Sequence, residues 1–487
     1  MKKIPQKYIY RILSKGGVLT PSTFAEVLDL ALKAGNESVF LGSRQDILFA
    51  IENNSLLPEF ETKGINIQKR SSGLQNVVSS FACVDILPST AWVHSGTFLK
   101  VLDQFSFNHQ LRVNIVDPKQ NMVPLFYGQL NFIASEIPNY WHLYLNLQSA
   151  QRPEQWPGLI FTDDIAEFAH TLEHLILQNN ISKIQDLMQQ LEGSELQKNT
   201  LNKESGIILP KGFFPYYEGL NKIDCKEQYW AGFYWRNNQY PIRFLLEVCD
   251  LCMKTNVGKI CFTPWKTFLI NGIDSKDKKY WDELIGRYGI NMRHSSFELN
   301  WHLPLFDVGA LRLKRYLVSK FDKFDIRTFG LSFAIQNELS GNFTTVVIRT
   351  KSRLSFLGKF DFTKTYSIDY AYDFNPNSND YIQYAGNLNK NQLPAALNDL
   401  SKRYYSLQFI QKAPEPGRKQ QKNAVQKVIV HQCSDCGTIY DERFGDETAK
   451  IAKGISFQQL PANYCCQLCD APKETFTTIE INDLITT

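Results

Sequence analysis

The sequence contains no apolar run long enough to cross a membrane. A membrane-spanning helix needs about 20 consecutive apolar residues, and no segment of the 487-residue chain comes near that length. The opening residues, MKKIPQKYIYRILSKGG, carry lysines but lack the uninterrupted apolar core of a secretory signal. These absences predict a cytoplasmic protein with no membrane partner.

Net charge is also low. A formal charge of +4 on 487 residues is too small to indicate nucleic-acid binding, so we expect no nucleic-acid partner. The charge is spread unevenly, because the segment from Val428 onward holds nine acidic and four basic residues, which leaves about +9 on the rest. Opposite signs of this kind are suited to docking between tail and body or with a basic partner. Ordinary surface variation is the alternative.

A disulfide framework is missing as well. The ten cysteines stand as two CxxC pairs near the end, one CDLC and scattered singles, unlike the dense spacing of small secreted domains. Reduced thiols and a metal site are the expectation. Before the final pairs, QKAPEPGRKQQKNAVQK contains two prolines, a glycine and almost nothing apolar, which predicts a flexible tether and a domain boundary.

The two cysteine pairs of the tail have the spacing of a metal site. Cysteines with two residues between them can direct both sulfurs inward from a tight turn, and two such turns make a tetrahedral thiolate cage. Cys433 and Cys436 form the first pair. In YCCQLC, Cys466 with Cys469 keeps the same spacing and leaves Cys465 as the spare. Zinc and iron both accept four thiolates, so the spacing does not choose between them.

The residues around these pairs resemble the rubredoxin family. The shared features lie within residues 430–476 and include Tyr440, the FGD segment, the GISF turn, LPANY and Phe476. The resemblance implies a small antiparallel sheet with an aromatic core and one iron that cycles between Fe3+ and Fe2+. The ligands that it implies are Cys433, Cys436, Cys466 and Cys469. A structural zinc knuckle on the same scaffold is the alternative.

Two positions depart from the family pattern. The proline usual after the third ligand is Gln467, and the glycine usual after the fourth is Asp470, so we expect a looser second turn and an altered potential. Gly437 permits the positive φ that the first turn needs. The aromatic side chains expected to pack around the cage and limit water are Tyr440, Phe457, Tyr464 and Phe476.

The first 410 residues contain a repeated α/β unit. One copy, SKGGVLTPSTFAEVLDLALKAGNESVFLGSRQDILFAI, begins at Ser14, and the other, NNQYPIRFLLEVCDLCMKTNVGKICFTPWKTFLINGI, begins at Asn237. Each combines a helix start, a helix with apolar residues at helical spacing, a turn and a β-rich segment. The duplication and the tether predict four parts: 1–225, 226–410, the linker 411–427 and the tail 428–487.

This duplicated plan resembles the siroheme-dependent sulfite and nitrite reductases over about residues 14–405. The resemblance is carried by GGVLTPSTF, LGSRQDILF and PKQNMVPLFYGQLNFIA. It implies an α+β fold with a duplicated ferredoxin-like body of nitrite/sulfite reductase type, followed by the small rubredoxin β domain. A generic α/β duplication is the alternative.

The same resemblance implies a siroheme cofactor in a basic pocket. Arg44 and Arg112 fit two cofactor-binding positions, whereas Gln75 and Gln110 stand where the family has basic residues. The family also needs four cysteines for a four-iron cluster next to the siroheme. No cysteine occurs between His294 and Cys433, so the cluster has no ligands in that region.

The remaining cysteines are interpreted as core thiols. Cys249 and Cys252 fall on one face of an expected helix, and Cys225 with Cys261 would be needed to complete a metal set. Because cysteine packs as a small hydrophobe, burial is the simpler explanation, also for Cys83. The histidines left as structural are His109, His294, His302 and His431.

We therefore expect an electron-transfer protein that carries one electron at a mononuclear iron centre and has no catalytic residues of its own. Its partner would be a redox protein, either a reductase that donates electrons or a nitrite/sulfite reductase that accepts them. One alternative is a siroheme-dependent nitrite or sulfite reductase with a built-in rubredoxin donor. Another is an interaction scaffold with a zinc knuckle.

Overall fold

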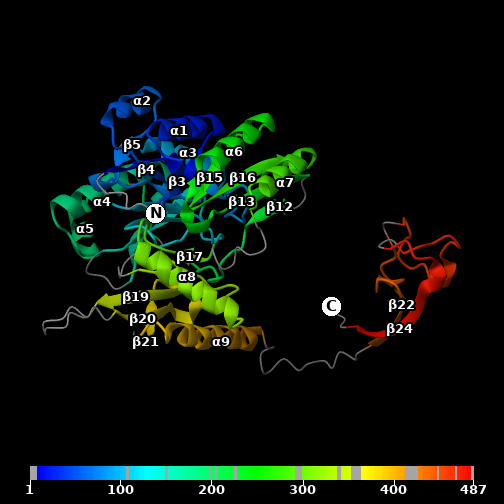
Figure 1. The fold of residues 1–487 in the computed structure, drawn as a ribbon. Helices are drawn as coiled ribbons and strands as arrows, with labels where there is room; N and C mark the ends of the chain where they lie inside the picture. Colours follow the sequence, from blue (N-terminus) through cyan, green and yellow to red (C-terminus); the bar gives the residue numbers. More distant parts are fainter. Residues whose placement is uncertain are drawn as a thin grey trace. The chain divides into compact units, whose positions relative to one another are not determined.

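The computed structural model divides the chain into two compact units, Met1–Ser406 and Leu407–Thr487 (Figure 1). It describes residues 8–105, 109–147, 152–194, 196, 199–202, 206–223, 227–290, 299–336, 342–352, 364–412, 426–446, 449–466 and 469–483. Cys225, His294, Gln467 and residues 413–425 of the predicted linker lie outside these ranges. No helix among the described residues combines the length and apolarity needed to span a bilayer.

The first repeat begins with a five-stranded sheet in the order β14-β3-β4-β1-β5. Helix α1 (Pro21–Lys33) starts at Thr20, whose side chain accepts a hydrogen bond from the N–H of Thr23, and has proline at its first position. Its inward face contains Phe24 and Val27, both fully buried. The other elements are β1 (Ile9–Ile12), β3 (Ser38–Leu41), β4 (Ile47–Ala50), α2 (Leu57–Thr62) and β5 (Ile67–Lys69).

The second repeat builds the same sheet in the order β12-β13-β16-β15-β2. Read from β2, its strands match the first sheet read from β14, so β15 corresponds to β3, β16 to β4 and β13 to β1. Its helix α6 (Ile242–Lys254) contacts α1 (Figure 1). The other elements are β12 (Gly219–Lys222), β13 (Gln228–Phe233), β15 (Ile260–Thr263), β16 (Thr267–Asp274) and α7 (Lys278–Arg287).

The two repeats exchange their outermost strands. Strand β14 (Tyr240–Pro241) of the second repeat pairs with β3, and β2 (Val18–Leu19) of the first pairs with β15. Asn238 reinforces the first exchange, because its amide donates to the Leu41 carbonyl at 2.7 Å and accepts from the Leu41 N–H at 3.1 Å. The predicted halves are therefore interlocked within one compact unit.

A second pair of sheets repeats another pattern. In each, the first three strands are parallel and the following ones antiparallel. The first has the order β11-β10-β9-β8-β7-β6 and the second β17-β18-β19-β20-β21. The duplication predicted from the sequence is thus present in both layers, and the α+β fold class is confirmed.

The elements of the first copy are β6 (Val78–Ser79), α3 (Ser95–Gln104), β7 (Val113–Val116), β8 (Leu130–Ala134), β9 (Tyr140–Leu145), β10 (Glu154–Phe161), α4 (Ile165–Gln178), α5 (Ile184–Leu191) and β11 (Leu201–Asn202). Those of the second copy are β17 (Trp301–His302), α8 (Val308–Lys323), β18 (Phe333–Ile335), β19 (Val346–Ser352), β20 (Lys364–Ala371), β21 (Tyr381–Leu388) and α9 (Leu393–Lys412).

The four described cysteines of the body lie in its cores. Cys249 and Cys252 on α6 are fully buried, and Cys83 and Cys261 are nearly so. Burial raises the pKa of Cys249 to about 12, with the nearby carboxylates of Asp250 and Asp29 adding to the effect. The interpretation of these residues as core thiols is confirmed.

The C-terminal unit is a three-stranded antiparallel sheet in the order β23-β22-β24. Strand β22 (Gln426–Cys433) pairs along its whole length with β24 (Phe476–Asp483), and β23 (Ile439–Tyr440) lies on its other side. The first cysteine pair begins with the last residue of β22, and the second pair precedes β24 in the chain. The sheet therefore brings two distant segments to the same end of the unit.

Candidate metal centre

The first cysteine turn is fixed by two backbone hydrogen bonds. The N–H of Cys433 donates to the Thr438 carbonyl at 2.8 Å, and the N–H of Gly437 donates to the Cys433 carbonyl at 2.9 Å. Gly437 has a φ of +79°, which glycine adopts without a steric penalty. The turn directs the side chain of Cys433 inward, where it is buried, and leaves Cys436 exposed.

The second turn repeats this geometry. The N–H of Cys466 donates to the Ala471 carbonyl at 2.8 Å, and the N–H of Asp470 donates to the Cys466 carbonyl at 2.8 Å. Asp470 occupies the place of Gly437 with a φ of +58°. Aspartate tolerates this left-handed conformation better than most residues. The two hydrogen bonds that flank Asp470 are as short as those of the first turn. Gln467 lies outside the described residues, so the expected looseness of the second turn stays a prediction.

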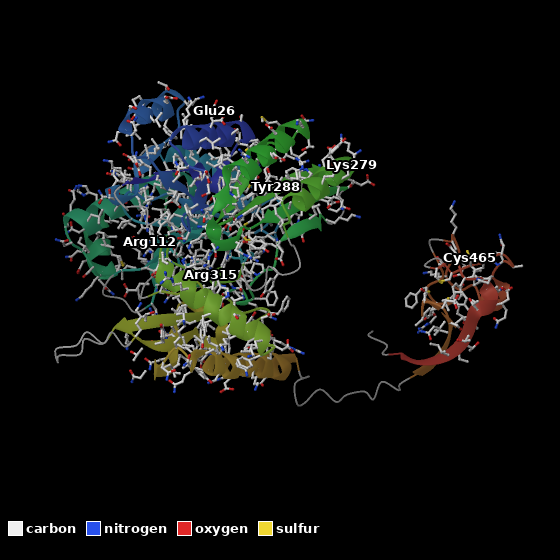
Figure 2. All side chains as sticks on the ribbon, in the orientation of Figure 1. Glu26, Arg112, Lys279, Tyr288, Arg315 and Cys465 are labelled. Atoms are coloured by element: carbon white, nitrogen blue, oxygen red, sulfur yellow. The ribbon has the colours of Figure 1, made fainter. Side chains whose placement is uncertain are left out.

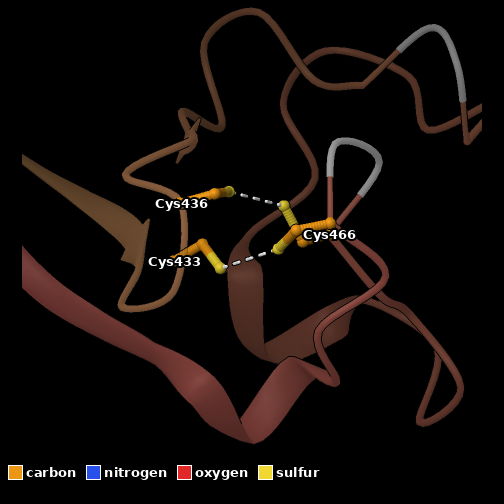
Figure 3. Close-up of side chains that lie close together, drawn as sticks. Cys433, Cys436 and Cys466 are labelled. Atoms are coloured by element: carbon orange, nitrogen blue, oxygen red, sulfur yellow. Dashed lines mark hydrogen bonds between the residues drawn. The ribbon is translucent and has the colours of Figure 1, made fainter.

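The two turns bring four sulfur atoms together (Figure 3). The Sγ atoms of Cys433 and Cys469 are 3.7 Å apart, those of Cys436 and Cys466 are 3.4 Å apart, and all four lie within 4.8 Å of one another. A tetrahedral metal with bonds of about 2.3 Å would separate its sulfurs by about 3.8 Å. Cys433 and Cys466 are buried whereas Cys436 and Cys469 are exposed, so one edge of the set faces solvent.

Cys465 lies outside this set. Its backbone forms a β-bridge with Pro472, and its side chain is half-buried (Figure 2). The four-sulfur group among the described residues contains Cys466 and not Cys465. The position thus agrees with the choice of Cys466 by spacing, although metal binding itself remains a prediction.

Backbone amides favour negative charge on Cys433. Burial acts to raise the pKa of Cys433, but the N–H groups of Cys436 and Asp435 and contacts with the sulfurs of Cys469 and Cys436 hold it below its usual value. In Cys469 the N–H of Ala471 also favours the thiolate, yet the crowding of Cys436 and the other sulfurs raises its pKa to about 12. Four thiolates at this spacing require a cation, which a bound metal supplies.

The four predicted aromatic rings pack against one another, and one of them, Phe476, also packs against the cluster that contains Cys433 and Cys466. Phe457 contacts Phe476 at 5.3 Å and Tyr440 at 5.7 Å between ring centroids, and Tyr464 lies 5.9 Å from Tyr440. The Tyr440 hydroxyl donates to the Ile455 carbonyl at 2.7 Å. With their polar ends satisfied, these rings form an apolar wall that limits water on the buried side of the sulfur set.

The donor set fits iron. Thiolates in a tetrahedral S4 arrangement are the ligands of iron or zinc, and the amides described above stabilise the additional negative charge that a reduced site carries. The group of four cysteines therefore has the composition and spacing to hold one iron.

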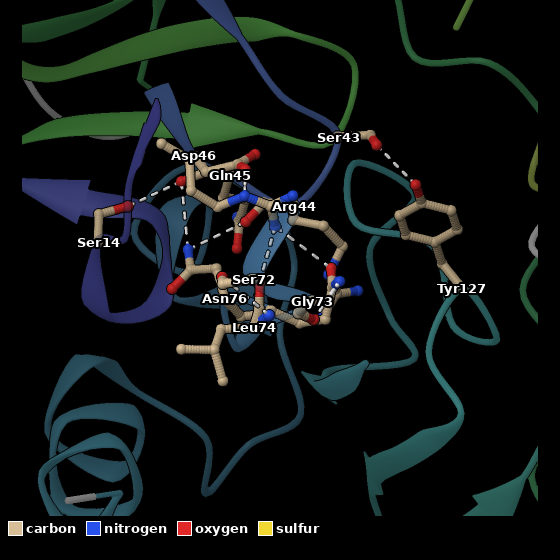
Figure 4. Close-up of polar contacts among 12 residues, drawn as sticks. Ser14, Ser43, Arg44, Gln45, Asp46, Ser72, Gly73, Leu74, Asn76 and Tyr127 are labelled. Atoms are coloured by element: carbon tan, nitrogen blue, oxygen red, sulfur yellow. Dashed lines mark hydrogen bonds and ion pairs between the residues drawn. The ribbon is translucent and has the colours of Figure 1, made fainter. Parts of the chain in front are cut away.

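Of the two predicted siroheme-binding residues of the body, Arg44 lies in a network of polar contacts (Figure 4). Arg44 is buried, and its guanidinium donates to the Asn114 side chain at 2.7 Å and to the carbonyls of Asn76 and Val113 at 2.7 and 2.8 Å. Burial lowers its pKa to about 9, so the group remains charged at neutral pH. It therefore serves as an internal cross-link between the sheets of the first repeat.

Arg112 lies close to Arg44 through a shared ring. The guanidiniums of Arg44 and Arg112 are 5.6 and 5.7 Å from the centroid of Tyr127, whose ring contacts Phe343 at 4.8 Å and whose hydroxyl lies 2.6 Å from that of Ser43. One aromatic ring, that of Tyr127, thus lies next to both cations. Among the described residues of the body, no cluster of thiols is placed to hold an iron cluster. Together with the contacts of Arg44 and Arg112, this absence does not fit siroheme. Gln75 also turns to the protein itself, since its side chain donates to the Gly73 carbonyl at 2.9 Å.

One side chain of the metal centre was missed by the sequence analysis. The Thr438 hydroxyl lies 3.0 Å from the sulfur of Cys436. The sequence shows only that a threonine follows the glycine of the first turn. Whether its hydroxyl reaches a sulfur depends on the side-chain rotamer and on the turn geometry.

Comparison with known proteins gives clear matches for the tail. The rubredoxin family model matches residues 430–476. Over 49 residues the chain is 47% identical to "Probable rubredoxin HupI" of Bradyrhizobium diazoefficiens, covering 10% of this chain and 71% of that protein. It is 42% identical over 50 residues to the rubredoxin of Megasphaera elsdenii, covering 10% of this chain and 94% of that one. Against Rubredoxin-2 of Alcanivorax borkumensis the match is 46% over 48 residues, which is 10% of this chain but only 28% of the relative.

The body matches a solved structure. The NirA protein of Mycobacterium tuberculosis aligns with a TM-score of 0.60 and 11% sequence identity, over 84% of this chain and 82% of that one. At this identity the likeness establishes the fold alone, so the body shares the fold of NirA. The tail is 47% and 42% identical to two rubredoxins over most of their length, which is enough to establish its family. By its C-terminal domain, this chain belongs to the rubredoxin family.

Proposed function

We propose that this protein transfers single electrons at one iron bound by Cys433, Cys436, Cys466 and Cys469. The observation that carries the proposal is the group of four sulfurs within 4.8 Å of one another, formed by two turns of matching backbone geometry. When bound, an iron supplies one-electron exchange between Fe3+ and Fe2+. A rubredoxin centre of this kind implies a redox partner protein.

The chain's own groups suit this role. Four thiolates give the site a net charge of −1 with Fe3+ and −2 with Fe2+, and amides of the Cys433 turn stabilise that extra charge. The aromatic wall limits water on one side. The exposed Cys436 and Cys469 offer the edge at which a partner can approach.

The body suggests which partner system the domain serves. Its fold is of the nitrite/sulfite reductase type, and the contacts of Arg44 and Tyr127 leave its residues without a fit to siroheme. We therefore infer that the chain delivers electrons to, or accepts them from, a separate nitrite or sulfite reductase system. The fold likeness supports this inference, and no residue contact identifies the partner.

Metal content and redox titration test the iron proposal. The full-length protein, isolated from iron-sufficient cells, should contain one iron per chain and absorb visible light through iron–thiolate bands. These bands should bleach with one electron per iron and return on oxidation. A chain ending at Lys427 should be colourless. Zinc in the native protein, or iron that cannot be reduced, would exclude the proposal, and an extractable tetrapyrrole would favour the reductase alternative.

Electron exchange with a partner tests the second part. Reduced protein mixed anaerobically with a siroheme-containing nitrite or sulfite reductase should reoxidise at a rate that depends on reductase concentration. The Cys466→Ser variant serves as the control for electrons that bypass the iron. Exchange no faster than with the variant would remove the reductase system from the proposal and leave the electron carrier intact.

A further inference from the structure

The two sulfurs at the exposed edge differ in one contact. Thr438 places its hydroxyl oxygen 3.0 Å from Cys436 Sγ. The residue is held in place because its carbonyl accepts the Cys433 N–H at 2.8 Å and the next residue begins strand β23. The hydroxyl therefore sits on a fixed part of the turn.

The matching position of the second turn lacks such a group. Ala471 stands two residues after Cys469, as Thr438 stands two residues after Cys436, and its carbonyl accepts the Cys466 N–H in the same way. Alanine has only a methyl group. The backbone is thus nearly duplicated while the hydroxyl is present on one side, which makes Thr438 an addition to the common turn geometry.

We propose that the Thr438 hydroxyl donates a hydrogen bond to the Cys436 thiolate and raises the reduction potential of the bound iron. The inference rests on the proposed function. A thiolate ligand is an acceptor, so the hydroxyl is the donor in the loaded site. Reduction adds one negative charge that is shared by the four sulfurs, and a donor aimed at a sulfur stabilises the reduced state more than the oxidised state.

The exposure of Cys436 explains why a hydrogen bond from the Thr438 hydroxyl should matter. Cys436 is exposed, so without Thr438 its sulfur would be solvated by mobile water. A hydroxyl fixed to the turn is oriented before reduction and needs no reorganisation. The same donor would lower the energy of the sulfur electrons, and so shift the sulfur-to-Fe3+ absorption to shorter wavelength.

Three variants of the full-length, iron-loaded protein test the proposal. Thr438→Val keeps the shape and removes the hydroxyl, whereas Thr438→Ser keeps the hydroxyl. The matched control is Thr477→Val, because the exposed Thr477 hydroxyl bonds only weakly to the Gln432 carbonyl, at 3.4 Å, and no contact joins it to a sulfur. The readouts are the midpoint potential by spectroelectrochemistry and the absorption maximum of the Fe3+ form.

Thr438→Val should lower the equilibrium constant for reduction of the iron by up to about tenfold, which for a one-electron couple lowers the midpoint potential by about 59 mV. It should also shift the absorption maximum of the Fe3+ form to longer wavelength. Thr438→Ser and Thr477→Val should stay close to the wild type. An unchanged potential in Thr438→Val, or an equal loss in Thr438→Ser, would overturn the proposal. A different result would exclude the proposed function itself: a wild-type protein that binds no iron, or whose iron cannot be reduced.

Discussion

The two units of this chain have kept different properties of the proteins that they resemble. The tail is 47% identical to a curated rubredoxin over 49 residues, whereas the body shares a fold with NirA at 11% identity. A fold survives wholesale replacement of its core residues, provided that size and apolar pattern are kept. A metal centre does not, because its chemistry resides in a few atoms whose placement is fixed by short turns.

The same spacing of cysteines makes the contrast concrete. Cys249 and Cys252 are three residues apart, as are Cys433 and Cys436. The first two lie on the buried face of a helix, where burial raises the pKa of Cys249 to about 12. Cys433 lies on a turn whose amides lower its pKa. The spacing of two cysteines therefore indicates metal ligands only when they lie on a turn whose N–H groups are directed at the sulfurs.

The largest effect is expected at the tail. Cys466→Ser should abolish iron binding, because it removes one of four thiolates from a closed set, whereas Cys465→Ser should retain a full iron equivalent. Iron analysis and visible absorption measure both. Loss of iron in Cys465→Ser alone would show that the neighbouring cysteine is the ligand.

In the body, Arg44 should matter for stability and not for colour. Arg44→Lys loses the forked bonds to Asn76, Val113 and Asn114, so the free energy of unfolding should fall by about 2 to 4 kcal/mol. All eight tryptophans precede residue 407, so tryptophan fluorescence in urea reports the body alone. The exposed Arg315 on α8 (Figure 2) provides the control Arg315→Lys. Unchanged stability together with a bound tetrapyrrole in the wild type would make Arg44 a cofactor residue after all.

A smaller loss is expected for the body's own cysteine pair. Cys252→Ser places a hydroxyl in an apolar core and should lower the free energy of unfolding by about 1 to 2 kcal/mol, with iron content unchanged. The tryptophan unfolding curve and iron analysis measure the two effects separately. Reduced iron in this variant would mean that the body contributes to metal binding.

The smallest change is expected at Asp470. Alanine lacks the local hydrogen bonding that helps aspartate adopt a left-handed conformation, so Asp470→Ala should destabilise the domain by about 1 kcal/mol, or about 4 to 8 °C. Asp470→Gly should stay near the wild type, since glycine accepts the conformation but has a more flexible unfolded chain. Heating while following the iron absorption gives the comparison. Equal midpoints for all three would remove the conformational argument.

The sequence could predict features that depend on residues close together in the chain, but not those that depend on contacts between distant segments. The four cysteines, the aromatic wall and the duplicated body depend on local spacing, which a sequence displays. The exchange of β2 and β14 could not be predicted, because each is two residues long and gains its place from a partner strand far along the chain. Nor could the contacts of Arg44, since an arginine in a basic-pocket motif reads the same whether its guanidinium faces a cofactor or the protein's own carbonyls.

The long ladder between β22 and β24 separates attachment from function. Its register pairs Gln426 with Asp483 at one end and Cys433 with Phe476 at the other, so the chain enters and leaves the domain at the end remote from the sulfurs. Additions to the chain at that end of the ladder therefore need not change the two turns that hold the sulfurs, so the domain should tolerate extension there without loss of its metal-binding geometry.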